Sequence, residues 1–160
     1  MRISRVPRLA TLLTWTLIAA ACGSDESDPA GPIPADLAGT WTASGTCSAC
    51  EFTFRSVAQP SLQLDMVAIG GQVRIEIRRS GTYEFFASMA GQSISRLGIV
   101  EINSNTLRFK DSATGAVDTA TYSVSGNLLT LDFQSVLQDF DIDDDGNPDP
   151  VRAYAVLRRN

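Results

Sequence analysis

Apolar and polar residues alternate with a period of two along several short stretches of this chain. In the clearest stretch, Val73, Ile75 and Ile77 alternate with charged residues. Such alternation is typical of a β-strand that buries one face, and the Ser80-Gly81 pair after it favours a tight turn. We expect strands at Thr40–Thr46, Phe52–Val57, Val73–Arg78, Tyr83–Ala87, Ile94–Ile102, Thr106–Lys110, Thr119–Val124, Leu128–Val136 and Val151–Arg158. Residues 62–69 fit either a strand or a short helix. The pattern predicts an all-β fold, with about eight to ten short antiparallel strands in a barrel or sandwich.

A weak internal repeat favours strands that run up and down around a barrel. Residues 102–109 and 124–131 share apolar positions, and each segment carries an asparagine at the same place in its turn. Two successive hairpins in like register fit neighbouring strands of such a barrel. The residues expected to face the interior are Trp41, Val73, Ile75, Tyr83, Phe85, Leu107, Phe109, Tyr122, Leu129 and Phe133. A barrel of this size is either filled by such side chains or holds one small ligand, and both alternatives stay open.

Three short motifs carry a resemblance to a known family. Residues Leu37–Trp41 (LAGTW) are similar to the Gly-x-Trp motif that opens lipocalins, while Gly81–Tyr83 and Val124–Leu131 resemble parts of bacterial lipocalin-like lipoprotein domains. The resemblance covers most of residues 37–160 and implies an up-and-down barrel of about eight strands with room for a small apolar ligand. It also implies that Trp41 plugs one end of the barrel beneath a basic residue of the last strand, for which Arg158 is the candidate. Taken alone, Trp41 is a core tryptophan that comes after a turn.

The first twenty-two residues have the pattern of an export signal. Three arginines precede an apolar run from Leu9 to Ala21, which is shorter than the roughly 20 residues that span a bilayer. The run ends in Ala-Ala-Ala-Cys-Gly and resembles a bacterial lipoprotein signal peptide with a lipidated Cys22. An ordinary secretory peptide that ends at Ala21 is the alternative. In such lipoproteins the glycine after the cysteine, where aspartate would favour the inner membrane, implies the outer membrane of the bacterial cell envelope.

Residues 23–35 differ in composition from the rest of the chain. They consist mainly of Gly, Ser, Pro, Asp and Glu, a mixture that cannot bury an apolar face and is expected to stay disordered. We therefore expect three parts: a signal peptide at 1–22, a tether at 23–35 and a β-barrel at 36–160. The tether would hold the barrel away from a membrane.

Composition excludes several classes of function. The chain has no histidine, which rules out Ser-His and Cys-His nucleophilic sites and histidine-ligated metals. Its formal charge of −5 disfavours binding to nucleic acid, because acidic surfaces repel phosphates. We expect a protein that is not an enzyme.

An acidic stretch near the C-terminus is the strongest candidate for chemistry. Asp141, Asp143 and Asp145 stand at alternate positions, Gly146 comes next, and Asp149 closes the run. Calcium prefers several hard oxygen ligands in a flexible loop, so the expected ligands are the carboxylates of Asp141, Asp143, Asp145 and Asp149 with the carbonyl of Asn147. The stretch resembles the Asp-x-Asp-x-Asp-Gly-x-x-Asp loops of integrin-type propeller blades. The twelfth position, a bidentate glutamate in an EF-hand, is Arg152, so we expect weak binding, with a Kd of about 10⁻⁴–10⁻³ M. The alternative is a solvated turn, because Asp, Asn, Gly and Pro are all turn residues.

Two cysteines near the start of the barrel suggest a disulfide. Cys47 and Cys50 are separated by two residues, and in an exported protein a disulfide is the expected state. Residues three apart on a straight strand point to opposite faces, so a bridge requires a turn between them. A redox or metal role is the alternative, although no βαβ pattern surrounds the pair.

These observations lead to one hypothesis and one rival. The hypothesis is a lipid-anchored, lipocalin-like envelope protein with a Ca²⁺-stabilised hairpin and a small apolar ligand. The rival is an adhesin or inhibitor with a filled barrel that contacts a protein partner. A ligand-binding barrel requires an apolar cavity of about 300 Å³ or more, whereas the rival requires a solid interior and an exposed apolar patch on its loops.

Overall fold

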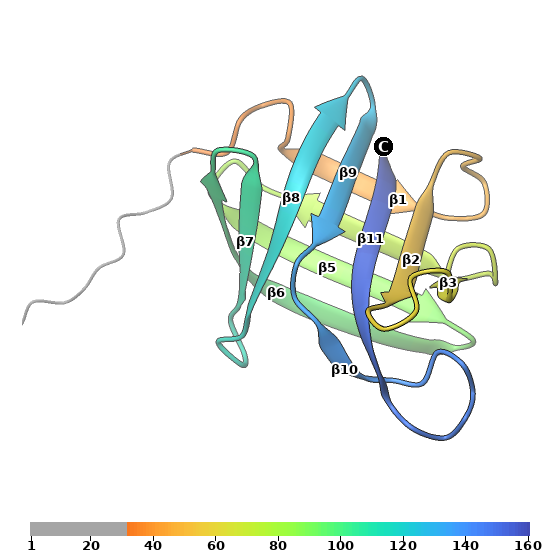
Figure 1. Cartoon of the computed structure of the whole chain (residues 1–160). Helices are drawn as coiled ribbons and strands as arrows, with labels where there is room; N and C mark the ends of the chain where they lie inside the picture. Colours follow the sequence, from red (N-terminus) through yellow and green to blue (C-terminus); the bar gives the residue numbers. More distant parts are fainter. Residues whose placement is uncertain (1–31) are drawn as a thin grey trace, which may run out of the picture.

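The computed structural model describes residues 32–160, apart from the side chains of residues 138–140. The described chain is built from strands joined by turns (Figure 1). The strands are β1 (Gly39–Ala43), β2 (Glu51–Ser56), β3 (Gln63–Asp65), β4 (Gln72–Ile77), β5 (Thr82–Met89), β6 (Gln92–Asn103), β7 (Thr106–Asp111), β8 (Val117–Ser125), β9 (Leu128–Phe133), β10 (Leu137–Phe140) and β11 (Asp149–Arg159). The described part contains no helix long and apolar enough to cross a membrane.

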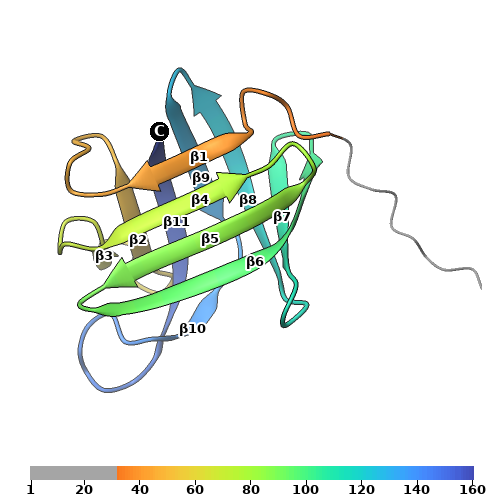
Figure 2. The same ribbon diagram turned by 180° about the vertical axis from the view of Figure 1, so that it is seen from behind.

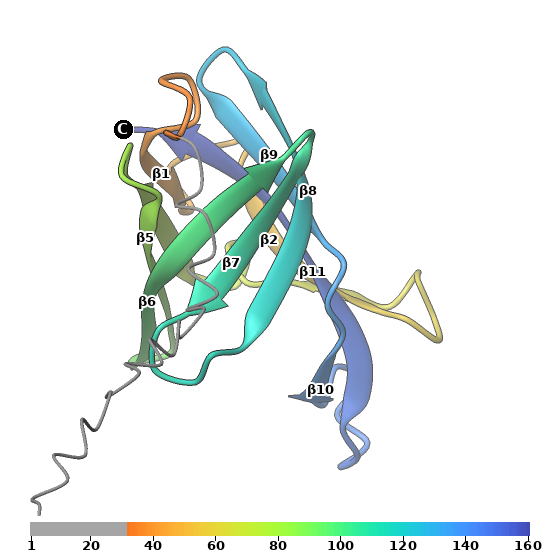
Figure 3. The same ribbon diagram turned by 90° about the vertical axis from the view of Figure 1, so that its left-hand side faces the viewer.

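Eight of the strands close into an antiparallel barrel, which confirms the predicted fold class. The order around the barrel is β1, β4, β5, β6, β7, β8, β9 and β11, and β11 returns to pair with β1. Figure 2 shows β1, β4, β5 and β6 side by side on one wall, and Figure 3 shows that wall edge-on, opposite the wall that contains β8 and β11. Closing the ring gives each strand of the barrel a neighbour on both sides, although residues 92–97 of β6 pair with β5 alone.

The long strand β11 makes the two ends of the barrel different. At its C-terminal end it pairs with β1, through Trp41↔Arg159 and Thr42↔Arg158. Its N-terminal half pairs instead with β2, from Val151↔Ser56 to Val156↔Glu51. β3 adds to β2, and β10 pairs with β11. The barrel is thus closed by β1 at one end, whereas at the other end β2 takes the place of β1 beside β11 and β3 follows on its outer side.

The core agrees with the alternation of the sequence. Trp41, Leu107, Leu129 and Leu157 have no exposed surface. Each fully buried side chain of this size contributes about 1.5–3 kcal/mol to stability. All ten residues expected to face inward are either buried or packed against the buried cluster.

Two segments differ from the expectations, and a third was left open between strand and helix. Ile33, in the predicted tether, is buried, and its N–H donates to the carbonyl of Arg79 at 3.2 Å. The folded part of the chain therefore begins before residue 36, because the burial of one apolar side chain is enough to hold this polar segment against the barrel. The ambiguous residues 62–69 form the short strand β3 and then turns. The predicted strand at residues 128–136 ends at Phe133, and the chain pairs again only from Leu137.

Candidate functional site

One end of the barrel is filled by side chains around Trp41. The indole N–H of Trp41 donates to the carbonyl of Leu37 at 2.8 Å, so burial leaves no polar atom of the ring unpaired. The guanidinium of Arg159 lies 4.4 Å from the centre of the ring and donates to the carbonyls of Ala38 and Asp36. The N-terminal segment with Ile33 and Leu37 completes this end, and both side chains are buried.

The basic residue over Trp41 is Arg159, so the assignment of Arg158 to this position is corrected. Alternate residues of β11, among them Ala155 and Leu157, are buried. The period of two therefore turns Arg159 inward and leaves Arg158 exposed to solvent.

The other end of the barrel contains a cavity of about 860 Å³. It lies where the wall formed by β2 and the N-terminal half of β11 faces the wall formed by β4, β5 and β6. The residues that line it are Phe52, Phe54, Met66, Ile75, Tyr83, Phe85, Ala87, Ser88, Met89, Ala90, Gln92, Ser93, Ile94, Arg96, Phe109, Asp118, Phe133, Ser135, Leu137 and Ala153. Most are apolar, and the volume falls in the range of about 300–1,000 Å³ that is usual for small-molecule sites.

Aromatic rings form two groups along the cavity. Phe52 contacts Phe54 edge-on with ring centres 5.4 Å apart, and Phe85 lies 6.2 Å from Phe52. On the other side, Tyr83 meets Phe109 edge-on at 5.1 Å, and Phe133 lies 6.1 Å beyond. Such contacts favour defined ring positions, so packed aromatic rings make up much of the apolar wall.

Polar side chains interrupt the apolar lining, among them two charged ones and a tyrosine. Arg96 of β6 and Asp118 of β8 form an ion pair, with Nη1 and Oδ2 3.4 Å apart. Tyr83 also lines the cavity, and burial raises the pKa of its hydroxyl; Asp111 and Asp118 raise it further, against an opposing effect of Arg96. Neither Arg96 nor Asp118 was predicted from the sequence. The sequence could have indicated that Arg96 shares the inward face of β6, because it stands four positions before the buried Val100 and alternate residues of a strand share a face.

Gly98 allows the ring of Tyr83 to lie where it does. A Cβ at this position would stand 2.0 Å from the carbonyl oxygen of Lys110 and 2.7 Å from Cε1 of Tyr83, closer than real Cβ atoms approach. Glycine is therefore required where β5, β6 and β7 pass each other beside the cavity.

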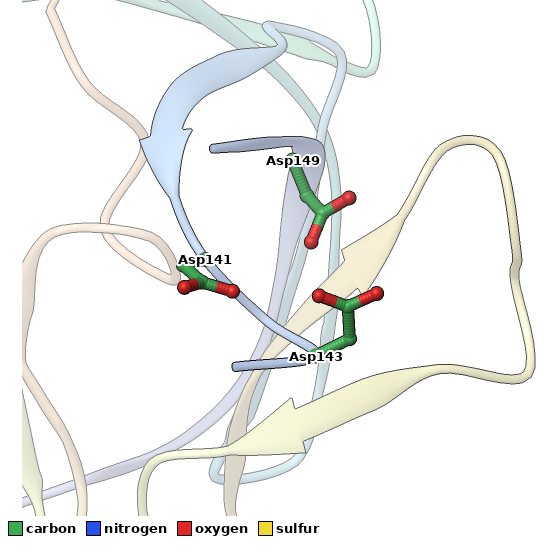
Figure 4. A group of neighbouring side chains, drawn as sticks. All are labelled: Asp141, Asp143 and Asp149. Atoms are coloured by element: carbon green, nitrogen blue, oxygen red, sulfur yellow. The ribbon is translucent and has the colours of Figure 1, made fainter. Parts of the chain in front are cut away.

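The acidic loop joins β10 to β11 at the same end of the barrel as the cavity. The structure brings Asp141, Asp143 and Asp149 together, with one carboxylate oxygen of each lying within 4.8 Å of the others (Figure 4). Asp141 and Asp143 are exposed and Asp149 is half-buried. Three converging carboxylates are a partial ligand set for a hard divalent cation.

Backbone groups shape this loop. The N–H of Asp145 donates to Asp141 and Asp143, both at 3.2 Å, and the N–H of Gly146 donates to Asp141 at 2.9 Å. Gly146 has a φ of +88°, which supports the sharp bend expected there. Partial desolvation raises the pKa of the Asp143 carboxyl; the Asp145 N–H bond opposes this, and the carboxylates of Asp145, Asp149 and Asp141 add to it. The carboxylates therefore repel one another, and a bound cation would remove that repulsion.

One of the five predicted ligands, the carboxylate of Asp145, takes other contacts. Oδ1 of Asp145 accepts bonds from the backbone N–H and the side-chain amide of Asn147, at 2.8 and 3.0 Å. Asp145 is therefore outside the group of three converging carboxylates.

The remaining predicted residues lie elsewhere. Cys47 and Cys50 form a disulfide with Cα atoms 5.3 Å apart, in the loop between β1 and β2. Two turn hydrogen bonds, from Cys47 N–H to Ser44 and from Cys50 N–H to Cys47, supply the bend that such a bridge needs. Cys22, the whole signal sequence and most of the predicted tether lie outside the described residues.

Comparison with known proteins gives no family for this chain: no protein-family model matches it, and no curated protein matches it.

Proposed function

We propose that this protein is a non-enzymatic binding protein of the bacterial cell envelope, whose barrel holds a small, mainly apolar ligand. The observation that carries the proposal is the cavity of about 860 Å³ with its two groups of aromatic rings. A barrel of about eight strands is often filled by its own side chains. The cavity opens to solvent, so its apolar walls are in contact with water. A bound apolar ligand would remove that surface from water, which is favourable by about 25 cal/mol per Å².

The proposal includes a lipid anchor at Cys22. It is supported by the sequence of residues 1–22 and by the polar segment after it. Ile33 docks at the end of the barrel closed by Trp41, so the chain enters the described structure at the end away from the cavity. An anchor attached there would direct the cavity away from the membrane, which we propose to be the outer membrane.

Calcium binding at the acidic loop is the second part of the proposal. Asp141, Asp143 and Asp149 would supply carboxylate ligands, and backbone carbonyls and water would complete the shell. The loop connects directly to β10, whose first residue, Leu137, lines the cavity. Calcium at this position would rigidify the rim of the cavity and would stabilise the fold.

A fluorescence titration tests the proposed function. N-phenyl-1-naphthylamine, which brightens in apolar surroundings, is added to the full chain and to the variant Ala153→Phe, which places a ring in the cavity. We expect saturable enhancement with the native chain and at least about tenfold weaker binding to the variant. Arg158→Ala, at an exposed position of the same strand, is the matched control. Equal enhancement with all three proteins would reject the cavity as the site.

The rival, an interaction module with a filled barrel, requires a solid interior. The cavity favours ligand binding over it.

A further inference from the structure

The ion pair of Arg96 and Asp118 differs from the other ion pairs of the described chain because both of its members line the cavity. The remaining pairs join arginines and glutamates that are absent from the lining. The side chains of Arg96 and Asp118 keep 45% and 33% of their exposure, so the pair lies at the mouth of the cavity, where both solvent and the head group of a ligand can reach it. The hydrogen-bonding groups that remain available around this pair therefore determine what it can bind.

Most of its hydrogen-bonding capacity is unused within the described residues. A guanidinium has five N–H donors, and Arg96 directs one of them to Oδ2 of Asp118, at a long 3.4 Å. Oδ1 of Asp118 accepts no bond from the described protein, and the hydroxyl of Tyr83, close to both charges, makes none either. The cavity wall thus offers free donors and a free acceptor side by side.

The local charge determines which ligand group fits. Arg96 carries one positive charge, whereas Asp118 and Asp111 carry two negative charges in the same neighbourhood. Burial is the main cause of the raised pKa of the Tyr83 hydroxyl; the two aspartates add to it and Arg96 opposes them. The two aspartates would repel a ligand carboxylate, whereas they would not repel a neutral polar group.

We propose that the ligand has an apolar body and one neutral head group that both donates and accepts hydrogen bonds, such as a primary carboxamide. Its carbonyl accepts from Arg96 and the Tyr83 hydroxyl, its N–H donates to Oδ1 of Asp118, and its body lies between the aromatic groups. This proposal rests on the proposed function, since it names the ligand class of the same cavity. It assigns Arg96 and Asp118 as the residues that select the head group.

The test compares two ligands with the same alkyl chain, dodecanamide and dodecanoate, by displacement of N-phenyl-1-naphthylamine at neutral pH. We expect the native chain to bind the amide about threefold to tenfold more tightly, the range for one net hydrogen bond at a partly exposed site. Asp118→Asn should shift the preference toward the carboxylate by about threefold or more, since Arg96 then lacks its counter-ion. Arg96→Gln should shift it the opposite way. Asp132→Asn, whose side chain is exposed and outside this lining, should leave the preference unchanged.

The outcomes separate the two proposals. Tighter binding of dodecanoate by the native chain, or an amide-to-acid ratio that does not change in Asp118→Asn and Arg96→Gln, would overturn the head-group assignment while ligand binding stands. Failure of the fluorescent probe and of both amphiphiles to bind the native chain would overturn the proposed function, and the head-group assignment with it. If one of the two variants fails to fold, the other decides, because the two shifts have opposite signs.

Discussion

The two ends of this barrel are built from the same strands but have opposite interiors. At the closed end, Trp41 has no exposed surface, its indole N–H is paired, and the guanidinium of Arg159 above it donates to two backbone carbonyls. At the open end, rings of similar size stand apart around about 860 Å³. The closed end is therefore the part that stabilises the fold, and the open end is the part that we propose to bind a ligand.

Two neighbouring alanines of β11 mark the change from one interior to the other. Ala155 has no exposed surface and is absent from the cavity lining, whereas Ala153, the preceding residue on the same face of the strand, lines the cavity. Both pair with phenylalanines of β2, Ala155 with Phe52 and Ala153 with Phe54. The same residue type on the same face of one strand thus has no spare space at one position and ample space at the next.

The largest effect is expected from Trp41→Ala at the closed end. Removing a fully buried tryptophan should lower the free energy of unfolding by about 3–5 kcal/mol, as measured by urea denaturation. Trp41→Phe should cost clearly less because it keeps an aromatic ring there. A loss below about 1 kcal/mol for the alanine variant would mean that this end is not the tightly packed one.

The two alanines give the most direct contrast between the ends. Ala155→Phe should lower the free energy of unfolding by about 1–3 kcal/mol, because a ring overpacks a filled core. Ala153→Phe should leave stability nearly unchanged, because its ring enters the cavity. Chemical denaturation of both variants measures this, and equal losses would contradict the difference in packing.

Calcium should stabilise the open end alone. With calcium at ten to a hundred times its Kd, the free energy of unfolding should rise by about 1–3 kcal/mol, seen as a higher melting temperature that EGTA reverses. Asp143→Asn should abolish the gain. Asp144→Asn is the matched control, since Asp144 is outside the carboxylate group and asparagine tolerates its φ of +60°. A melting temperature that does not respond to calcium would reject the site.

A smaller effect is expected from the cover of the tryptophan. Arg159→Ala removes a cation–π contact and hydrogen bonds to two carbonyls, and should cost about 1–2 kcal/mol. Arg158→Ala should be close to neutral, because Arg158 is exposed. If the two variants lost equal stability, the placement of Arg159 over Trp41 would be wrong.

The smallest effect concerns acid stability beside the cavity. Hydrogen bonds from the N–H and hydroxyl of Thr114, together with the N–H of Ala113, lower the pKa of Asp111 below its ordinary value of 3.8, against the effect of burial. A carboxyl with a depressed folded-state pKa contributes stability above its unfolded-state pKa, and that contribution is lost as the pH falls through the folded-state pKa. The urea concentration at the midpoint of unfolding should therefore decrease as the pH falls below about 4. This decrease should be less steep in Asp111→Asn than in the native chain.

The sequence predicted the barrel because alternation is a local property. A period of two shows which residues of a strand share a face, and the buried set of Val73, Ile75 and Leu129 agrees with it. The same period, counted from Leu157, would have selected Arg159 in place of Arg158. The spacing of aspartates also indicated which carboxylates could converge, although the bonds from Asn147 that turn Asp145 aside depend on the folded loop.

The cavity could not be predicted in this way. Alternation shows that Phe54 and Phe85 face inward, but it does not show how far apart the opposing walls stand. That distance depends on the replacement of β1 by β2 beside β11, which is a pairing between segments about a hundred residues apart in sequence. The pairing of Arg96 with Asp118 joins β6 and β8 across β7, and it likewise depends on how the strands lie in the barrel.

Methyl resonances recorded by NMR during a titration with N-phenyl-1-naphthylamine test the division between the two ends most directly. The methyl groups of Ala87 and Ala153, which line the cavity, should shift as the probe's ring enters. No shift is expected for the methyl resonances of Leu157, at the closed end, or of Leu97 and Ile99, which are exposed on β6. Shifts confined to Leu97 and Ile99 would place the ligand on the outer face of the barrel and would contradict a binding cavity at the open end.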